Sequence, residues 1–223
     1  KRQTQTLVDA YELKDSGERP DKKADYDKNK PYYEGRDPRF EKTIAKNGDT
    51  KWPNWNETAL ETYQGGANAE PLSGGTPTGY YLKKYCQTSI NTTTAKPTTD
   101  NHTWIIYRLG EFYLNYAEAL FKYLGTAYAT NNEFPIPANE MVSKTRRRTK
   151  VNMPKFPAGL DNKLWWEKYQ NERMVELAFE GHRFWDVRRW KEGDKHFSSI
   201  DEMKIYKSGD SYSYRRVTCL LYT

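Results

Sequence analysis

The most specific string in the chain is NERMVELAFEGHRFWDVRRW, which occupies residues 171–190. On an α-helix, Glu172, Glu176 and Glu180 follow one another at four-residue intervals, so their carboxylates share one side. The same string supplies four arginines that can neutralise them, namely Arg173, Arg183, Arg188 and Arg189. Because paired arginine and glutamate side chains satisfy one another when buried, the pattern favours an ion-pair lattice that holds helices together.

Two chemical alternatives for this string stay open. Glycoside hydrolases use a pair of carboxylates as general acid and base, so two of the three glutamates could cleave a glycan. A metal site from Glu180, His182 and Asp186 is the second alternative, although one histidine with two carboxylates at irregular spacing is a weak metal signal. The lattice is the favoured interpretation, and we expect no catalytic residue, no metal and no cofactor.

The chain upstream of the string contains further helix patterns. Apolar residues spaced by three and four predict an amphipathic helix with a buried stripe, made of Leu109, Phe112, Tyr113, Tyr116, Ala117, Leu120 and Leu124. Gly125 stands where a helix stop is expected. A shorter helix is predicted over 140–149, and a third runs from an Asp161 N-cap into the string. The helical aromatic residues are expected in the core, namely Phe112, Tyr116, Trp165 and Trp185.

Residues 1–100 have a different composition. Their aromatic residues outnumber leucine, isoleucine, valine and methionine by 11 to 8. Gly, Pro, Asp and Asn punctuate the segment, so we expect mostly loop. A stretch so poor in aliphatic residues is not expected to form a core of its own.

The charge is concentrated in one place. The chain of 223 residues has a net charge of +6, and one run supplies five of the excess positive charges, namely Lys144, Arg146, Arg147, Arg148 and Lys150. A diffuse basic face for nucleic acid is therefore not indicated. Cys86 and Cys219 lie far apart with no CxxC motif, which indicates neither a zinc site nor a disulfide scaffold.

Several motifs together resemble one family. The string YRLGEFYLNYAEAL starts at Tyr107, and NERMVELAFEGHRFWDVRRW follows about 50 residues later. LVDAYELKDSG, EGRDPRF and GYYLKKY precede them in the same order. In this combination the chain is similar to the C-terminal region of the SusD/RagB family, the nutrient-binding surface lipoproteins of Bacteroidetes. A further family pattern falls on residues 142–150, with Arg146 and Arg148 at its arginine positions and Thr149 and Lys150 in place of small residues.

The resemblance implies a mainly α fold, in which a tetratricopeptide-like helical scaffold supports long irregular ligand-binding loops. Residues 1–100 are then a loop-rich segment that holds the ligand site, and residues 101–223 are the helical C-terminal region. Both belong to one continuous fold, the C-terminal half of a SusD-like protein whose N-terminal half is missing from this chain.

The resemblance also implies a function. Proteins of this family bind oligosaccharides without catalysis and deliver them to a SusC-like, TonB-dependent outer-membrane channel. The implied location is the extracellular face of the outer membrane, through an N-terminal lipid anchor that is absent from this chain. A RagB-like receptor for peptides is the alternative, and a carboxylate-based glycoside hydrolase is a more distant one.

Sugar binding requires aromatic faces for stacking and a few polar partners for hydroxyl groups. Trp52 and Trp55 flank Pro53 and Asn54, and proline stiffens such a loop so that less entropy is lost on binding. The candidate ligand residues are Trp52, Asn54, Trp55, Tyr32, Tyr33 and Tyr63. Two alternatives stay open, because the tryptophans could simply cap the scaffold, and the chain could be an interaction module for the channel alone.

Overall fold

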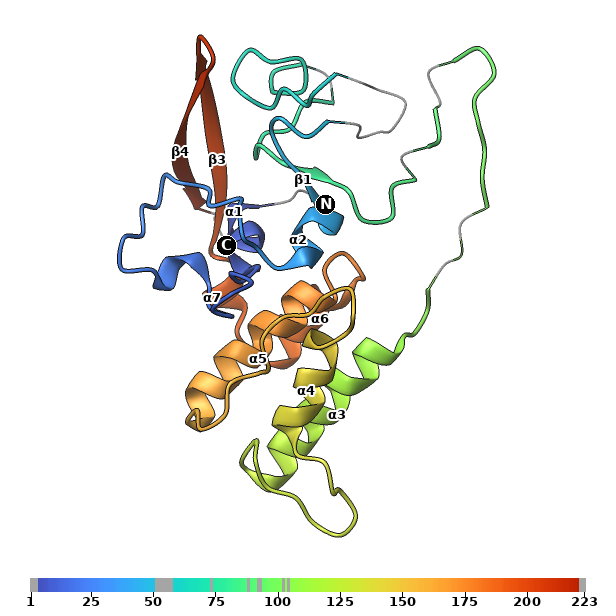
Figure 1. Cartoon of the computed structure of the whole chain (residues 1–223), viewed down its shortest axis with the longest axis vertical. Helices are drawn as coiled ribbons and strands as arrows, with labels where there is room; N and C mark the ends of the chain where they lie inside the picture. Colours follow the sequence, from blue (N-terminus) through green and yellow to red (C-terminus); the bar gives the residue numbers. More distant parts are fainter. Residues whose placement is uncertain are drawn as a thin grey trace.

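The fold is built from seven α-helices and two small antiparallel strand pairs in the described part of the chain (Figure 1). The structure is a computed structural model that describes residues 4–50, 58–72, 74–87, 89–91, 94–101, 103 and 105–220. The first hundred residues supply α1 (Gln5–Ala10), the 3-10 turn η1 (Pro20–Lys22), α2 (Pro38–Thr43), β1 (Ile44–Ala45) and β2 (Tyr81–Leu82). The remaining elements are α3 (Leu109–Leu124), α4 (Ala138–Arg146), α5 (Asn162–Glu176), α6 (His182–Arg189), α7 (Gly193–Phe197), β3 (Ser199–Ser208) and β4 (Ser211–Leu220).

Most of the helix boundaries predicted from the sequence are present in the structure. Helix α3 ends at Leu124, and Gly125 adopts a left-handed conformation with φ +69°, as a C-terminal glycine does. The Asp161 side chain accepts a hydrogen bond from the Leu164 N–H at 2.8 Å and caps α5. Gly181, with φ +88°, separates α5 from α6. These boundaries confirm the predictions for the longer helices, whereas α4 begins and ends two to three residues earlier than predicted.

The larger of two hydrophobic cores lies among the helices. It joins α3, α4 and α5 through Leu114, Val142 and Trp165, all fully buried. The Trp165 ring stacks on Phe121 at a centroid distance of 4.5 Å and on Tyr169 at 5.3 Å. Aromatic stacking adds to the apolar burial, so Trp165 is the centre of this core, as expected from its helical position.

The second core combines residues that are far apart in the sequence. Val8 of α1 and Tyr11, which follows α1 directly, meet Phe40 of α2, Val175 of α5 and Ile205 of β3. The loop-rich first hundred residues therefore bury their few apolar side chains against a helix and a strand from the second half. This agrees with the expectation that the segment does not form a core of its own.

The β3–β4 hairpin was not predicted. It pairs Ser199 with Leu220 at one end and Ser208 with Ser211 at the other, and Gly209 and Asp210 form the turn. The loop that contains residues 58–80 lies beside it (Figure 1). The fold is thus mostly helical with small hairpins.

Three expectations about the core were wrong. Leu109 is 62% exposed, Phe112 is 56% exposed and Trp185 is 67% exposed. Trp165 and the half-buried Tyr116 pack as expected. On α6 the buried residues are Asp186 and Val187, and the buried Asp186 carboxylate pairs with Arg173 and Arg189. The aromatic side of α6 is left on the surface of the described structure.

None of the helices in the described part of the chain has both the length and the apolarity needed to cross a bilayer. Cys86 and Cys219 are both free and exposed.

Candidate functional site

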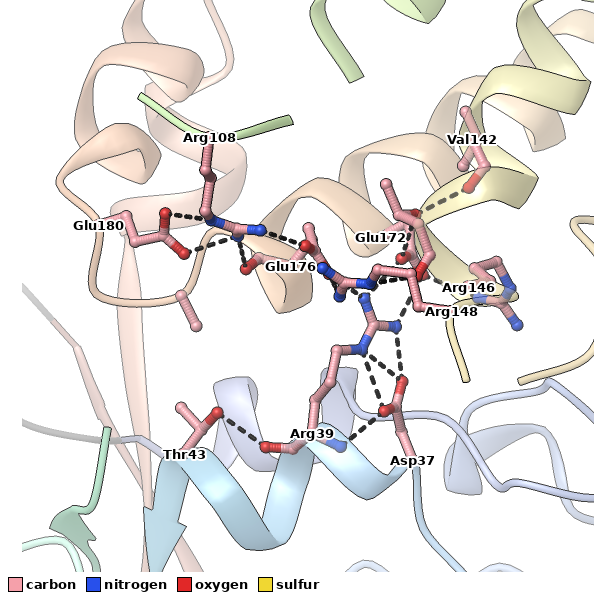
Figure 2. A network of polar contacts seen from close by, with 12 residues as sticks. Asp37, Arg39, Thr43, Arg108, Val142, Arg146, Arg148, Glu172, Glu176 and Glu180 are labelled. Carbon is pink, nitrogen blue, oxygen red and sulfur yellow. Dashed lines mark hydrogen bonds and ion pairs between the residues drawn. The ribbon is translucent and has the colours of Figure 1, made fainter. Parts of the chain in front are cut away.

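The glutamates of the string at residues 171–190 lie at the centre of a buried ion-pair lattice (Figure 2). Glu172 Oε1 accepts hydrogen bonds from Arg39 Nη1 at 2.7 Å and from Thr145 Oγ1 at 3.0 Å. Its Oε2 accepts from Arg146 Nη1 at 2.8 Å. Arg146 is 1% exposed and also donates to Glu12 at 2.6 Å. Arg39 lies on α2 in the loop-rich segment, whereas Thr145 and Arg146 both lie on α4, so Glu172 ties the two parts of the chain together.

The other two glutamates extend the lattice toward the start of α3. Glu176 Oε2 accepts from Arg39 and from Arg148, each at 2.7 Å. Arg108 donates to Glu176 and makes two bonds of 2.7 Å to the carboxylate of Glu180. All three carboxylates therefore have arginine partners, as the favoured interpretation of the string predicted. The partners differ from the expected ones: they come from outside the string, namely Arg39, Arg108, Arg146 and Arg148. Within the string, Arg173 and Arg189 bond to Asp186 instead. The basic run gains a structural explanation as well, because Arg146 and Arg148 belong to this lattice.

The electrostatics of the lattice do not suit acid–base chemistry. Burial alone would raise the pKa of the Glu172 carboxyl, but Arg39 and Arg146 together lower it to about 2. The pKa of Glu180 is also lowered, because hydrogen bonds from Arg108 and Lys84 outweigh its burial. A glycosidase needs a general acid with a raised pKa. Glu172 and Glu180 are instead held as anions, which have no proton to donate as a general acid.

The residues of the metal alternative do not converge. Glu180 bonds to Arg108 and Lys84, while Asp186 bonds to Arg173 and Arg189. Among the described residues, no three His, Cys, Asp or Glu side chains are placed to hold a metal ion.

The predicted ligand residues are distributed over several environments. Trp52, Asn54 and Trp55 lie outside the described residues. The Tyr32 hydroxyl accepts from the Asp27 N–H at 2.7 Å and donates to the Asp25 carbonyl at 3.2 Å, so it closes its own loop.

Tyr33 packs against the second core. Its ring meets Phe40, Tyr80 and Tyr214 at centroid distances of 6.2 to 6.3 Å. Its hydroxyl bonds to the Tyr80 hydroxyl at 3.2 Å, and burial raises the pKa of Tyr33 well above its usual range. Tyr33 is thus partly buried against the second core, with aromatic and hydroxyl partners from the fold.

Tyr63 has the environment closest to a stacking platform. It is half-exposed, and its ring lies 5.9 Å from the ring of Tyr212 on β4. The Lys207 ammonium group lies 5.1 Å from the Tyr63 centroid. A hydrogen bond with Glu61 raises the pKa of the Tyr63 hydroxyl. Tyr212 and Lys207 were missed at the sequence level, because the hairpin that brings them to Tyr63 was missed.

A cavity of about 240 Å³ lies between the loop at residues 62–79 and the strand β3, and neither Tyr63 nor Tyr212 lines it. Its polar lining comes from Thr62, Gln64, Glu70, Thr76 and Lys204. Its apolar lining comes from Ala69, Pro71, Pro77, Met203 and Ile205. Mixed linings of this kind suit a ligand that has both apolar faces and polar edges.

Comparison with known proteins decides the family. A sequence model of the SusD family matches residues 2–218, nearly the whole chain. The chain belongs to the SusD family. Members of this family are binding proteins without catalytic activity, in agreement with the saturated glutamates of the lattice. Among curated proteins, none matches the chain.

Solved structures of SusD-like proteins confirm the fold. A SusD-like protein from Bacteroides fragilis superposes with a TM-score of 0.76 at 26% sequence identity, over 100% of this chain and 42% of that one. A second protein from the same organism, described as a SusD-like carbohydrate-binding protein, gives a TM-score of 0.65 at 26% identity, over 90% of this chain and 37% of that one. This SusD-family chain therefore spans about two fifths of the length of these solved relatives and matches their C-terminal portion.

Proposed function

We propose that this SusD-family chain binds an oligosaccharide without cleaving it and forms part of a receptor that delivers the glycan to a SusC-like, TonB-dependent outer-membrane channel. The observation that carries the proposal is the family match over residues 2–218. A relative of the same fold is described as carbohydrate-binding. The extracellular face of the outer membrane is the corresponding location.

The two parts of the chain have different roles in this proposal. The helices α3 to α6 act as a tetratricopeptide-like scaffold, and the irregular loops of residues 1–100 present the ligand site. The arginine–glutamate lattice supports this assignment, because Arg39 of the loop-rich part is fixed to Glu172 and Glu176 of α5. Loops held in this way lose less entropy when a ligand binds.

The ligand site includes Tyr63 together with the predicted residues Trp52, Asn54 and Trp55. The tyrosine pair with Tyr212 offers aromatic faces of the kind on which pyranose rings stack. Tyr32 and Tyr33 have hydroxyl and ring partners within the fold, so we assign them a supporting role.

A glycan array probed with the chain tests the proposal, followed by affinity electrophoresis in gels that contain the best polysaccharide. We expect retardation of the chain with no release of reducing ends. Tyr63→Ala and the double variant Trp52→Ala, Trp55→Ala should weaken the retardation. Tyr123→Ala is the matched control, because Tyr123 is 70% exposed on α3, and the helical end of the molecule lies away from the hairpin (Figure 1).

Two results would contradict the proposal. Release of reducing ends that is lost in Glu176→Gln would show a hydrolase. Binding of peptides from a library with no response to any glycan would show the peptide alternative.

A further inference from the structure

The outer edge of β4 is open near the tip of the hairpin. Ser208 and Ser211 flank the two-residue turn and form a hydrogen-bonded pair. Every second residue of β4 therefore points its backbone N–H and carbonyl away from β3. These outward residues are Tyr212, Tyr214, Arg216 and Thr218. Figure 1 shows β4 on the side of the hairpin away from the loop at residues 58–80.

Two contacts near the base of the hairpin agree with this alternation. The Met203 N–H donates to a carbonyl of the loop beside β3 at 3.2 Å. Arg216 lies opposite Met203 in the ladder, and its N–H donates to Asn29 Oδ1 at 3.0 Å. The base of the β4 edge is therefore covered. The outward backbone groups of Tyr212 and Tyr214 bond to none of the residues that the structure describes, so the edge at the tip is open.

The tip of this edge lacks the protection that open strands usually have. An open edge is a template for pairing with a further strand, and proteins commonly protect it with proline, a β-bulge or several charges. Residues 211–215 contain no proline, and Arg215 is their one charged residue. The register of β4 with β3 continues without a bulge, and both Tyr212 and Ser213 are exposed. The tip of β4 is therefore suited to pair with another extended segment.

We propose that this edge binds a second copy of the chain, through antiparallel pairing of the two β4 strands about a two-fold axis at Ser213. In this register, Tyr212 of each copy lies opposite Tyr214 of the other. The two tyrosine pairs exchange four backbone hydrogen bonds, which use all the outward donors and acceptors of both residues. A shift by two residues in one direction places Tyr214 opposite the hairpin turn. A shift in the other direction places Tyr212 opposite Arg216, whose N–H is already bonded.

The side chains of the open stretch are compatible with this self-pairing. Each Tyr212 forms an aromatic cross-strand pair with Tyr214 of the other copy, and such pairs stabilise sheets. Arg215 lies opposite Ser211, so no like charges face each other directly. Arg216 is already paired with Asp9, and the single charge of Arg215 gives little selection for an acidic peptide. The sequence of the edge thus fits a second copy better than a charged partner.

The interface is small, and the dimer is correspondingly weak. It uses about five residues of each copy, compared with roughly 20–30 residues a side in a standard interface. We expect a Kd of about 0.1–1 mM. Pairing joins the two hairpins into one four-stranded sheet, with Tyr212 and Tyr63 of both copies on the same face.

Amide hydrogen exchange measured by NMR tests the pairing residue by residue. At a Kd of about 0.1–1 mM, roughly 20–50% of the chain is monomeric at about 1 mM, and nearly all of it at about 10 µM. The Tyr212 and Tyr214 amides should therefore exchange about twofold to fivefold more slowly at the higher concentration. The Ser213 and Arg215 amides bond to β3 in both states, so their exchange should not depend on concentration.

Variants at Ser213 test the two-fold axis itself. The Ser213 side chains of the two copies lie opposite each other in a non-hydrogen-bonded pair, with Cα atoms about 4.5 Å apart. Ser213→Lys should abolish the concentration dependence, because like charges directly opposite destabilise a sheet. An equimolar mixture of Ser213→Lys and Ser213→Glu should restore it through a heterodimer. Ser208→Lys is the matched control, because Ser208 is exposed at the same end of the hairpin but lies on β3, and it should leave pairing unchanged.

Three results would overturn the proposal. The first is exchange of the Tyr212 and Tyr214 amides that does not change with chain concentration. The second is a dimer that persists in Ser213→Lys in sedimentation velocity, because the contact would then use another surface. The third is protection of the two amides only by an added acidic peptide, with the chain monomeric throughout, which would assign the edge to a different partner.

Discussion

Replacing Glu172 with glutamine should remove a large part of the stability of the fold. The carboxylate accepts four hydrogen bonds, two from Arg39, one from Arg146 and one from Thr145. In Glu172→Gln one oxygen becomes an NH₂ group that faces guanidinium donors. Two buried arginines then lose a shared counter-charge, although Arg39 keeps Asp37 and Arg146 keeps Glu12.

Two routes give the magnitude of this loss. Lowering the pKa of Glu172 from 4.5 to about 2 corresponds to about 3 kcal/mol of stability at neutral pH. Breaking a buried ion pair by removal of one partner costs roughly 3–5 kcal/mol. For a chain of this length, a loss near 3–4 kcal/mol lowers the Tm by roughly 10 °C.

Urea denaturation followed by circular dichroism measures the change, with Glu140→Gln as the control. Glu140 pairs with Arg147 at 3.7 Å, and both side chains are about half exposed, so its replacement should cost less than about 1 kcal/mol. A loss in Glu172→Gln as small as that of the control would refute the reasoning, because it would mean that the lattice contributes no more than a surface pair.

Three further predictions concern pH, packing and backbone. The pKa of Glu172 is lower in the folded state, so its contribution to stability is complete above about pH 5 and should be lost as the pH falls toward 2. The free energy of unfolding of the wild type should therefore fall more steeply with decreasing pH over that range than that of Glu172→Gln. Trp165→Ala should cost about 3–5 kcal/mol, and Trp185→Ala less than about 1 kcal/mol, because only the first ring is buried; thermal unfolding compares them. Gly79→Ala should destabilise the fold by more than about 1 kcal/mol, because its Cβ meets the Met203 carbonyl oxygen at 2.7 Å; equal stability of this variant and the wild type would speak against the close approach.

The sequence was a good guide wherever the signal was local. The cap at Asp161 and the stop at Gly125 depend on a few neighbouring residues, and both are present in the structure. The four-residue spacing of Glu172 and Glu176 likewise fixed which carboxylates share a side. Their partners on α2 and α4 could not be read from spacing, because contacts between distant segments depend on the tertiary fold.

Two features of the structure show what local patterns leave out. A stripe of apolar residues shows that a helix has an apolar side, but not what covers it, and Leu109 and Phe112 of α3 are exposed for this reason. The hairpin had a usable signal in the Gly209–Asp210 turn between two polar, β-branched and aromatic segments. Recognition of that turn would have predicted the hairpin, but not the contact of its Tyr212 with Tyr63, which depends on the tertiary fold.

The measurement that tests the central claim most directly is isothermal titration calorimetry of the chain with the oligosaccharides selected on the glycan array, together with an assay for reducing ends in the same samples. The account predicts saturable binding, weakened in Tyr63→Ala and unchanged in Tyr123→Ala, with no new reducing ends. Absence of binding to any glycan, or cleavage of the one that binds, would contradict it.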